Sequence, residues 1–466
     1  MRSGAIVLLL LPALARAQTQ APVEDIQRET QKPAAVQSTQ EKAQAASAEA
    51  KSREQAAGEN VSYEQVLAHP DDIELNYRYA RAQVRRGDVK GASATLERLL
   101  LVAPGRADFR LFYAFVLMRL DDLPEAKREL ETVLAVPGLS DDVRREAEHN
   151  RAIIESRLRR NRLLGRVSAG AEYDSNRNAG PVGGARLLGD APITLDQPSK
   201  ARPDAAFVVS GSVEARRDLA TQQGDELFLG GDYYRAEQST LKTLSLQAFS
   251  ARGGADIKSG PFVLTPALIA ERVDLGHATL LHDSGGSLRL LTRLREGLEI
   301  WMEGRGQYDS YSNTPEVRTA DQRSGPEWSL AAGAAKPVTP KLRLGSSVLR
   351  LDKYAALPFN AYQRIVFSGD AVYLPGKGVF VAGSASWGRD DYIAPDPAIS
   401  VTRRRDEALR LGVMVGVPLA GLGWRFRNVV WTTGYEYFRS TSNIPNYEYF
   451  NNRVVSLLTY RWEVGF

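Results

Sequence analysis

The side chains that most often carry out acid–base, nucleophilic or metal chemistry are few in this sequence. It has no cysteine, and its histidines are only four: His69, His149, His277 and His282. His277 and His282 fall in one predicted loop, followed by Asp283 and Ser284, which are the residue types of a hydrolase triad. Neighbouring residues of an extended segment point to opposite sides, so residues 282–284 cannot form a triad by themselves. An esterase is therefore a minor alternative.

Metal, cofactor and nucleic-acid binding have equally little support. Two histidines five residues apart do not form a metal site without further ligands. The doublets Gly183-Gly184 and Gly285-Gly286 lack the strand–loop–helix context of a phosphate-binding loop. A net charge of +4 over 466 residues does not favour nucleic acid. We therefore expect a protein that is not an enzyme, needs no metal or cofactor and binds no nucleic acid.

The most distinctive polar run is Tyr173-Asp174-Ser175-Asn176-Arg177-Asn178. Asp, Ser and Asn side chains hydrogen-bond to nearby backbone, so a turn at the rim of a sheet is the simplest interpretation. The run follows an alternating segment and lies where the first predicted strand ends. We take Tyr173, Asp174, Ser175, Asn176 and Asn178 as a candidate motif at the entry to the strand region.

From residue 165 onward, apolar and polar residues alternate with the period of two of a strand that has two different environments. Leu409, Leu411 and Val413, for example, alternate with Arg410 and Gly412. About fourteen such segments are long enough for membrane strands: 165–175, 204–217, 224–236, 241–256, 261–275, 284–294, 296–310, 322–336, 340–354, 360–373, 377–391, 404–417, 421–439 and 449–466. They predict a transmembrane antiparallel β-barrel over residues 165–466, with twelve or sixteen strands as alternatives.

The predicted links between these strands alternate in length. Tight turns follow strands four, six, ten and twelve, and longer polar loops follow strands one, seven, eleven and thirteen. An outer-membrane barrel has short periplasmic turns and long outer loops. We expect a lumen wide enough for an extended chain or a small solute, lined by charges such as Glu214, Arg216, Arg305 and Arg410.

The last stretch, residues 453–466, separates an apolar face from a charged one. Val454, Leu458, Tyr460, Trp462 and Phe466 share the apolar face. We interpret it as the closing strand, which faces outer-membrane lipid and ends in an aromatic girdle. We expect Tyr460, Trp462 and Phe466 to form the signal that the barrel-assembly machinery recognises.

The segment before the barrel, residues 61–164, is predicted to be helical and repetitive. Tyr79-Ala80 recurs 34 residues later as Tyr113-Ala114, and Ala92, Leu96 and Asp88 recur at the same spacing. A helix–turn–helix repeat of 34 residues with small residues at the helix contact is the tetratricopeptide pattern. Two repeats are clear, and residues 141–160 supply a helix that can cap them.

Such repeats bind polypeptides along the concave face formed by their first helices. In this chain that face should carry a basic and aromatic set: Tyr77, Arg81, Arg85, Phe115, Met118 and Arg119. We expect this set to form a groove that suits an extended peptide. The alternative is that the helices serve only as a spacer.

The N-terminal 60 residues look like targeting and leader sequence. Residues 1–17 combine Arg2, an apolar core and Ala15-Arg16-Ala17, which predicts a cleaved signal peptide. Residues 18–60 are rich in Gln, Ala, Glu and Ser and should be disordered. No later stretch contains 18 continuous apolar residues. The sequence therefore predicts an outer-membrane protein of a Gram-negative bacterium, with its helical domain in the periplasm.

Two segments resemble the surface lipoprotein assembly modulator (Slam) family. They are AGAEYDSNRNAG, which opens the barrel region, and the repeat VAPGRADFRLFYAFVLMRLDDLPEAKRELETVLA. The order of signal peptide, short tetratricopeptide domain, linker helix and barrel is also similar. The resemblance implies a translocon that moves a specific lipoprotein, or a related secreted protein, across the outer membrane. Asp174, Ser175, Asn176 and Asn178 match the family's barrel-entry motif.

Two other functions remain open from the sequence. One is a tetratricopeptide–barrel porin that exports an exopolysaccharide, although such a protein would usually carry a longer repeat array. The other is a passive porin, which would need no periplasmic domain. No nucleotide-binding motif is present, so we expect export to be driven by folding or capture of the cargo outside the cell.

Overall fold

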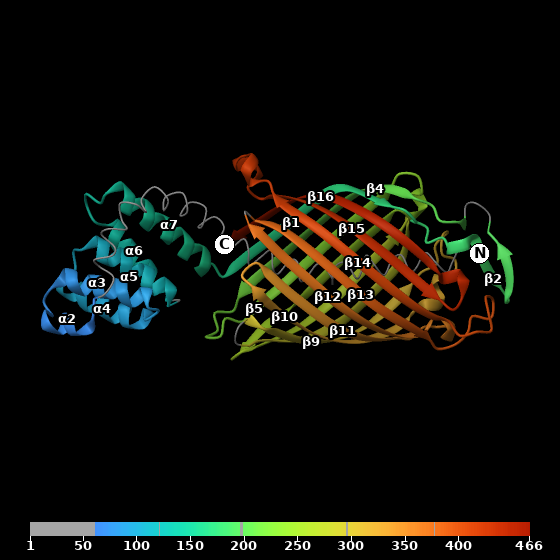
Figure 1. Ribbon diagram of the computed structural model, residues 1–466, viewed down its shortest axis with the longest axis horizontal. Helices are drawn as coiled ribbons and strands as arrows, with labels where there is room; N and C mark the ends of the chain where they lie inside the picture. The colour runs from blue at the N-terminus through green and yellow to red at the C-terminus, as the bar shows by residue number, and fades with distance from the viewer. Residues whose placement is uncertain (1–60, 121, 196–198, 295–296, 377) are drawn as a thin grey trace. The chain divides into compact units, whose positions relative to one another are not determined.

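The computed structural model describes residues 61–466, apart from 121, 196–198, 295–296 and 377. The described residues form two compact units, one of helices and one of strands (Figure 1). The expected fold class is confirmed, because paired helices precede a closed antiparallel barrel of fourteen strands. The predicted signal peptide, residues 1–17, and leader, residues 18–60, lie outside the described residues.

The helical unit repeats with the predicted period. Its helices are α2 (Tyr63–Ala68), α3 (Ile73–Arg85), α4 (Val89–Val102), α5 (Ala107–Arg119), α6 (Leu123–Leu134) and α7 (Asp141–Leu158). The first residues of α3 and α5, Ile73 and Ala107, are 34 positions apart, and so are those of α4 and α6. Within the described residues, no helix is both long and apolar enough to cross a bilayer.

Aspartates fix where these helices begin. The Asp72 carboxylate accepts a hydrogen bond from the Leu75 backbone N–H at 2.9 Å, and Asp88 accepts one from Gly91 at 2.9 Å. Asp122, one period after Asp88, does the same for α6. Each bond satisfies a backbone donor that the first helical turn would otherwise leave without a partner. The predicted turn positions therefore also act as helix caps.

Alanines form the contacts between paired helices. Ala80, Ala92, Ala114 and Ala126, which occupy equivalent positions in the two repeats, are completely buried. They lie in one core with Leu96, Leu130 and the α7 residues Ala147 and Ile154. The small side chains allow close helix packing, and α7 covers the end of the second repeat as the sequence predicted.

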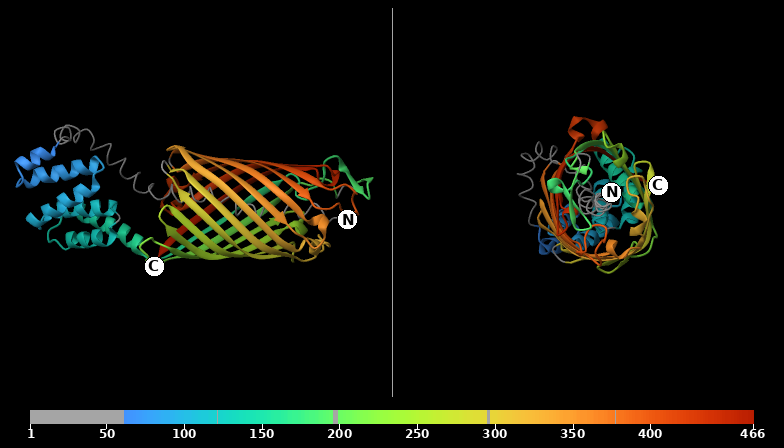
Figure 2. Two further views of the ribbon diagram at one scale, coloured as in Figure 1. Left: turned by 90° about the horizontal axis from the view of Figure 1, so that it is seen from below. Right: turned by 90° about the vertical axis from the view of Figure 1, so that its right-hand side faces the viewer.

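The barrel consists of fourteen antiparallel strands. In chain order they are β1 (Asn161–Asp174), β4 (Asp204–Asp218), β5 (Glu226–Gln238), β6 (Leu246–Ser259), β7 (Phe262–Leu275), β8 (Ala278–Arg293), β9 (Glu299–Tyr311), β10 (Gly325–Thr339), β11 (Leu342–Lys353), β12 (Tyr362–Gly376), β13 (Val379–Tyr392), β14 (Arg405–Pro418), β15 (Val429–Ser442) and β16 (Tyr449–Gly465). Each strand pairs with its neighbour in this order, and β16 closes against β1 (Figure 2). A separate hairpin, β2 (Ala185–Leu188) with β3 (Ala191–Thr194), lies in the first loop.

Alternation along the strands separates an apolar outer face from a polar inner face. On β16, Val454, Leu458 and Tyr460 are about half exposed on the outer face, whereas Thr459 between them is buried. Ser168 on β1 lies within hydrogen-bond distance of Thr459, with 2.9 Å between the hydroxyl oxygens. A closed sheet can hold both environments because side-chain direction changes at every residue.

The two ends of the barrel differ in their connections. At the turn end, where β1 begins, most links are short, such as residues 260–261 and 340–341. At the loop end, the links include 175–203, 312–324, 393–404 and 443–448, which follow strands one, seven, eleven and thirteen as predicted. One predicted tight turn is wrong, because residues 419–428 form a longer link with two 3-10 turns.

The predicted loop that contains His277 and His282 is also wrong. β8 begins at Ala278, so only Gly276 and His277 connect it to β7. Gly276 takes a positive φ of 63°, which lets two residues reverse the chain. His282 lies opposite Arg272 on the exposed outer face, and Asp283 is buried on the inner face. These two side chains therefore point to opposite sides of the sheet.

Candidate functional site

The inner face of the barrel is lined by ionisable side chains, many of which form ion pairs. Near the turn end, the Arg216 guanidinium donates to Glu214 at 2.6 Å and to Asp256 at 2.8 Å. Arg162 donates to Glu226 at 2.7 Å beside them. These pairs connect β1, β4, β5 and β6. The predicted lumenal charges Glu214 and Arg216 therefore form one network.

The wall formed by β12 to β16 carries further ion pairs. Arg364 donates two hydrogen bonds to Asp390, at 2.6 and 2.5 Å, and Arg410 donates to Glu436 at 2.8 Å. Arg453 on β16 pairs with the buried Glu172 on β1, across the closing seam. A bidentate arginine–carboxylate pair fixes the geometry of both side chains. This half of the lumen is polar and close to charge-balanced.

The opposite wall carries a row of carboxylates. Glu271 on β7 lies directly opposite Asp283 on β8, and Asp283 lies directly opposite Asp309 on β9. On the other side, Glu271 faces Ser250, which faces Asp232. Asp309 accepts hydrogen bonds from Lys353 at 2.6 Å and from Gln307 at 2.7 Å. We call Asp232, Ser250, Glu271, Asp283 and Asp309 the acidic row.

Two loops fill the interior at the loop end. Val317 and Ala320, in and beside η6 (Ala320–Arg323), are completely buried. They pack in one apolar core with Leu241 and Leu244 of the β5–β6 loop and with strand residues. The strand residues in this core are Leu246, Val273, Leu275, Leu280 and Leu281. We call the 312–324 loop, with its buried Val317 and Ala320, the loop-end plug.

The hairpin of the first loop is bound to two other loops. The Asn446 amide, in η10 (Pro445–Tyr447), accepts from the Leu187 N–H at 2.6 Å and donates to the Leu187 carbonyl at 3.0 Å. Gly189 and Asp190 donate backbone hydrogen bonds to residues of the 393–404 loop. The Ser400 hydroxyl donates to Asp190 and lowers the pKa of that carboxyl. The loop end is therefore a connected layer.

The predicted entry motif lies where β1 meets β16 at the loop end. Asn176 is the centre of the motif: its side chain donates to the carbonyls of Gly180 and Phe450, at 2.9 and 3.1 Å, and accepts from the Gly180 N–H at 2.8 Å. Asn178 exchanges two hydrogen bonds with residues 200–202. Tyr173 is half exposed on the outer face, whereas Asp174 faces in and accepts from the Asn176 N–H at 2.9 Å. The motif ties the first long loop to the closing strand.

One further residue of this segment was not predicted as a site residue. Arg177 is buried, and its guanidinium donates to the Leu244 carbonyl in the β5–β6 loop at 2.8 Å. It links the closing seam to the loops that fill the interior. No spacing in the sequence indicates this contact, because its partner is 67 positions away.

The predicted groove residues lie on α3 and α5, the first helices of the two repeats. Tyr77 stacks on Phe109 at 4.4 Å between ring centroids and meets Phe112 edge-on at 5.7 Å. Phe112 stacks on Phe115, which is exposed. The structure thus joins aromatic rings of both repeats into one continuous strip, and burial raises the pKa of Tyr77.

The remaining groove residues differ in exposure. Arg81, Arg85 and Arg119 are exposed on the same two helices, whereas Tyr77 and Met118 pack against the core. Arg106 extends the basic character, since its guanidinium lies 3.9 Å from the Phe109 ring centroid and 2.6 Å from the Asp108 carboxylate. The hydrogen bond from Arg106 lowers the pKa of Asp108. Phe109 is completely buried, so only the exposed Phe115 ring and the exposed guanidinium groups are available to stack on and hydrogen-bond an extended peptide.

The aromatic residues predicted as an assembly signal lie at the end of β16. Tyr460 and Trp462 stack with their ring centroids 6.0 Å apart, and Phe466 is exposed. Trp462 lies over Gly165 of β1, where an added Cβ would come 2.1 Å from its ring. A glycine is therefore required in the neighbouring strand for this aromatic to lie flat.

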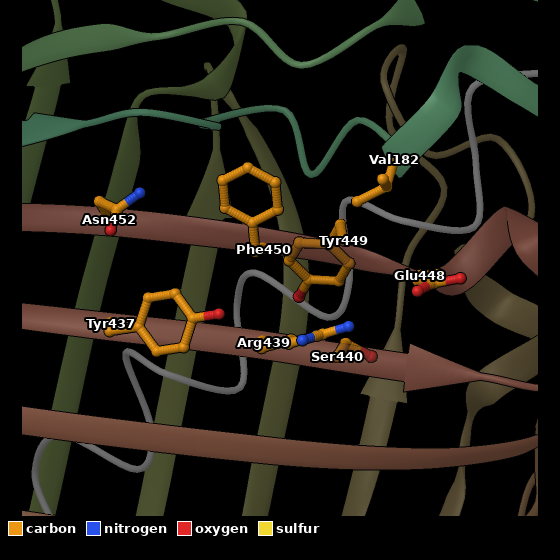
Figure 3. A pocket seen from close by; sticks show the side chains of 8 residues that line it. All are labelled: Val182, Tyr437, Arg439, Ser440, Glu448, Tyr449, Phe450 and Asn452. Carbon is orange, nitrogen blue, oxygen red and sulfur yellow. The ribbon is translucent and has the colours of Figure 1, made fainter.

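A crevice of about 370 Å³ lies beside the entry motif, and the sequence analysis did not predict it. Figure 3 shows Tyr437 and Arg439 on β15 next to Phe450 and Asn452 on β16, with Val182 of the first loop facing them. Such a mixture of rings, one guanidinium and one amide could hold an amphiphilic molecule. Strand periodicity places Tyr437 and Arg439 on one face, but only the fold brings Val182 to them.

The described part of the chain contains no group of three His, Asp or Glu side chains arranged to hold a metal ion. A tetratricopeptide repeat model matches residues 53–108. No curated protein matches the chain.

The solved structures similar to the chain include an outer membrane protein, a porin and a secretin, all of low sequence identity. A loop-deletion mutant of OmpT, an outer membrane protein of Vibrio cholerae, is 9% identical, with a TM-score of 0.34, and the match covers 64% of this chain and 98% of that one. An anion-selective porin from Comamonas acidovorans is 7% identical, with a TM-score of 0.36 and the same coverage. A bacterial polysaccharide outer membrane secretin is 11% identical, with a TM-score of 0.30, covering 65% and 98%.

Proposed function

We propose that this protein is an outer-membrane translocon that exports a specific lipoprotein, or a related secreted protein, to the cell surface. In this proposal the helical repeats bind the cargo in the periplasm and the barrel passes it outward. The observation that carries the proposal is the presence, in one chain, of aromatic and basic side chains on the first helices of two tetratricopeptide-like repeats and of a barrel whose inner face carries charged side chains.

The two faces of the barrel support a membrane location. Large apolar residues on the outer face are exposed in every part of the wall, among them Val167, Leu229, Leu268, Leu330 and Leu458. Burying exposed apolar surface of this kind in lipid is favourable, at roughly 25 cal/mol per Å². A closed barrel also leaves no strand edge without hydrogen bonds in the bilayer.

The groove supports a polypeptide as the cargo. Its aromatic strip runs across both repeats, from Tyr77 to Phe115, and exposed arginines border it. Extended peptides are bound through backbone hydrogen bonds and side-chain pockets, and such a strip supplies both stacking and donors. The Slam resemblance of the repeat segment and of residues 169–180 supports a lipoprotein or its secreted relative as that polypeptide.

The test is reconstitution of export with a candidate cargo. The protein is co-expressed with a candidate lipoprotein or secreted protein, and surface exposure of that cargo is measured by protease accessibility in intact cells. Export should require the full chain and fall when the helical unit is removed. Unchanged exposure of the cargo after deletion of this protein would overturn the proposal.

A liposome-swelling assay separates export from a general pore. Sugar flux that is strong and independent of residues 18–164 would favour a porin. Flux specific for a charged polysaccharide would favour polysaccharide export. Little flux with either sugar, together with cargo export, is the result expected for a dedicated translocon.

A further inference from the structure

The acidic row on the inner wall contains more carboxyl groups than cations that contact them. Directly opposite residues of an antiparallel pair have Cβ atoms about 4.5–5.5 Å apart, and like charges at such positions are destabilising. Glu271, Asp283 and Asp309 occupy three consecutive positions of this kind. A sheet would ordinarily avoid this arrangement, so the row requires a physical explanation.

Two members of the row have partners that the structure shows. Asp309 is held by Lys353 and Gln307. Asp232, at the other end, accepts a hydrogen bond from the Ser250 hydroxyl at 3.2 Å. The row is therefore anchored at both ends, and the excess charge lies in its middle.

The middle of the row holds a buried carboxylate without a partner. Asp283 is 4% exposed, and neither of its carboxylate oxygens has a hydrogen-bond partner among the described residues. Glu271 beside it is half buried and thus remains reachable. Leaving a buried acceptor without a donor is costly, and the cost is larger for a charged group.

A positive group, Arg305, faces the same wall and interacts electrostatically with both Glu271 and Asp283, but Asp283 has no hydrogen bond from it. Arg305 is opposite Ser287 on β8, four residues along β9 from Asp309. Its Nε atom has no hydrogen-bond partner in the described part of the chain. Lys353 is already bound to Asp309. These two cations leave Asp232, Glu271 and Asp283 with an excess of acceptors.

The rest of the lumen provides the contrast. Arg364 with Asp390, Arg410 with Glu436, and Arg216 with Glu214 and Asp256 are ion pairs in direct contact. Ion pairs in direct contact thus occur in several parts of the lumen, whereas no such pair is seen for Glu271 or Asp283 among the described residues. This difference lies on one wall of the lumen, where Glu271 is more exposed than the buried Asp283.

We propose that Glu271 and Asp283 form a binding site for a cationic nitrogen group, the guanidinium or ammonium of an arginine or lysine side chain. The proposal rests on the proposed function, since the passing polypeptide would supply that group. A guanidinium offers several N–H donors in a planar fork, which matches adjacent carboxylates. A bare metal ion fits less well, because the described residues offer no trio of ligands for one.

The test uses short peptides as probes and does not involve the cargo. Fluorescently labelled hexa-arginine, hexa-lysine and hexa-glutamate are titrated into the full-length protein in detergent, and anisotropy reports binding. The two cationic peptides should bind and the anionic one should not. The double variant Glu271→Gln, Asp283→Asn should bind the cationic peptides about tenfold more weakly, the scale expected for loss of close charge pairs.

A matched control distinguishes this site from general surface charge. Asp352→Asn removes a carboxylate from the outer face of β11 and should leave peptide affinity unchanged. Glu271→Gln alone should give an intermediate affinity, and the heat-modified mobility of each variant reports barrel assembly. Displacement by KCl but not by the uncharged sugar trehalose distinguishes a cation site from peptide stacking.

Equal affinity of the wild-type protein and the assembled double variant would overturn the proposal. So would equal binding of hexa-glutamate. Failure of the cargo-export experiment would instead count against the proposed function, because the peptide titration gives the same result whatever the natural cargo is.

Discussion

Ser175 and Asn452 exchange two hydrogen bonds at the point where the first and last strands of the barrel meet. The Ser175 backbone N–H donates to the Asn452 carbonyl at 2.9 Å, and the Asn452 N–H donates to the Ser175 hydroxyl at 2.8 Å. The serine side chain thus replaces a backbone carbonyl beyond the end of β1, which is Asp174. The hydrogen bonding between β1 and β16 therefore continues for one residue beyond the end of β1.

Weakening this junction should loosen barrel closure. Ser175→Ala removes the acceptor of Asn452 and should cost about 1 kcal/mol, whereas Asn176→Ala removes several buried hydrogen bonds and should cost about 1–3 kcal/mol. The temperature at which the folded band on a denaturing gel is lost should fall in that order. Ser312→Ala, in an exposed loop position, is the control. Equal melting of all three variants would contradict the role of the junction.

Replacing the exposed groove residues should impair export and leave the fold intact. The combined variant Arg81→Ala, Arg85→Ala, Phe115→Ala and Arg119→Ala changes exposed side chains, for which stability effects are usually within about 0.5 kcal/mol. Cargo at the cell surface should decrease several-fold, while heat-modifiability stays normal. Arg128→Ala and Arg145→Ala, exposed on α6 and α7, form the matched control. Export at the wild-type level would indicate that the helices are a spacer.

The repeat core should be sensitive to single truncations. Leu96 is completely buried between helices, so Leu96→Ala should destabilise the helical unit by about 2–5 kcal/mol. Leu101, on the same helix, is 81% exposed, so Leu101→Ala should have little effect. Proteolysis of the helical unit in the folded protein measures the difference. Similar protease resistance of the two variants would show that the core is not packed as described.

Acid should weaken the helical unit partly through Asp108. The hydrogen bond from Arg106 lowers the pKa of Asp108 in the folded state. A lowered folded pKa stabilises the fold above the unfolded value, about 4, and this contribution is lost as pH falls through the folded value. Asp108→Asn should therefore reduce stability at neutral pH and flatten its dependence below about pH 4. Ellipticity at 222 nm during thermal unfolding measures this, and parallel pH profiles would refute it.

Disrupting the loop-end plug should increase ion conductance. Val317 is completely buried among leucines, so Val317→Asp would place a charge in that core and displace the loop. Planar-bilayer currents should rise above those of the wild-type protein. Val401→Asp makes the same change at a loop position that is 80% exposed and should have no effect. Identical currents from both variants would show that the plug does not limit flow.

Local periodicity was enough to predict most of the fold. The 34-residue period was readable because Ala80, Ala92, Ala114 and Ala126 must be small wherever helices pack closely. The strand count could be predicted because lipid requires apolar side chains and the lumen requires polar ones, so the two types alternate along each strand. The loop around His282 was mispredicted because a two-residue turn leaves a weak signal and the glycines that follow resemble a loop.

The arrangement of the site depended on contacts that a sequence does not encode locally. The acidic row requires the register between β7, β8 and β9, which is set by turns of different lengths. The sequence predicted Asp283 to lie in a loop, whereas the structure places it on β8, opposite Glu271 and Asp309. Likewise, Arg177 reaches Leu244 only because the β5–β6 loop folds into the interior.

The pairing of Ser168 with Thr459 has a consequence for the order in which the molecule is made. The two residues are 291 positions apart, so β1 emerges long before its final partner exists. The entropic cost of closing so long a loop grows only with the logarithm of its length, but strands far apart in sequence pair slowly during folding. Until β16 arrives, β1 has an edge that any other strand could occupy. The hydroxyl pair and the Glu172–Arg453 ion pair then favour pairing of β1 with β16 over pairing with another strand. Backbone hydrogen bonds cannot make this distinction, because every strand offers the same donors and acceptors.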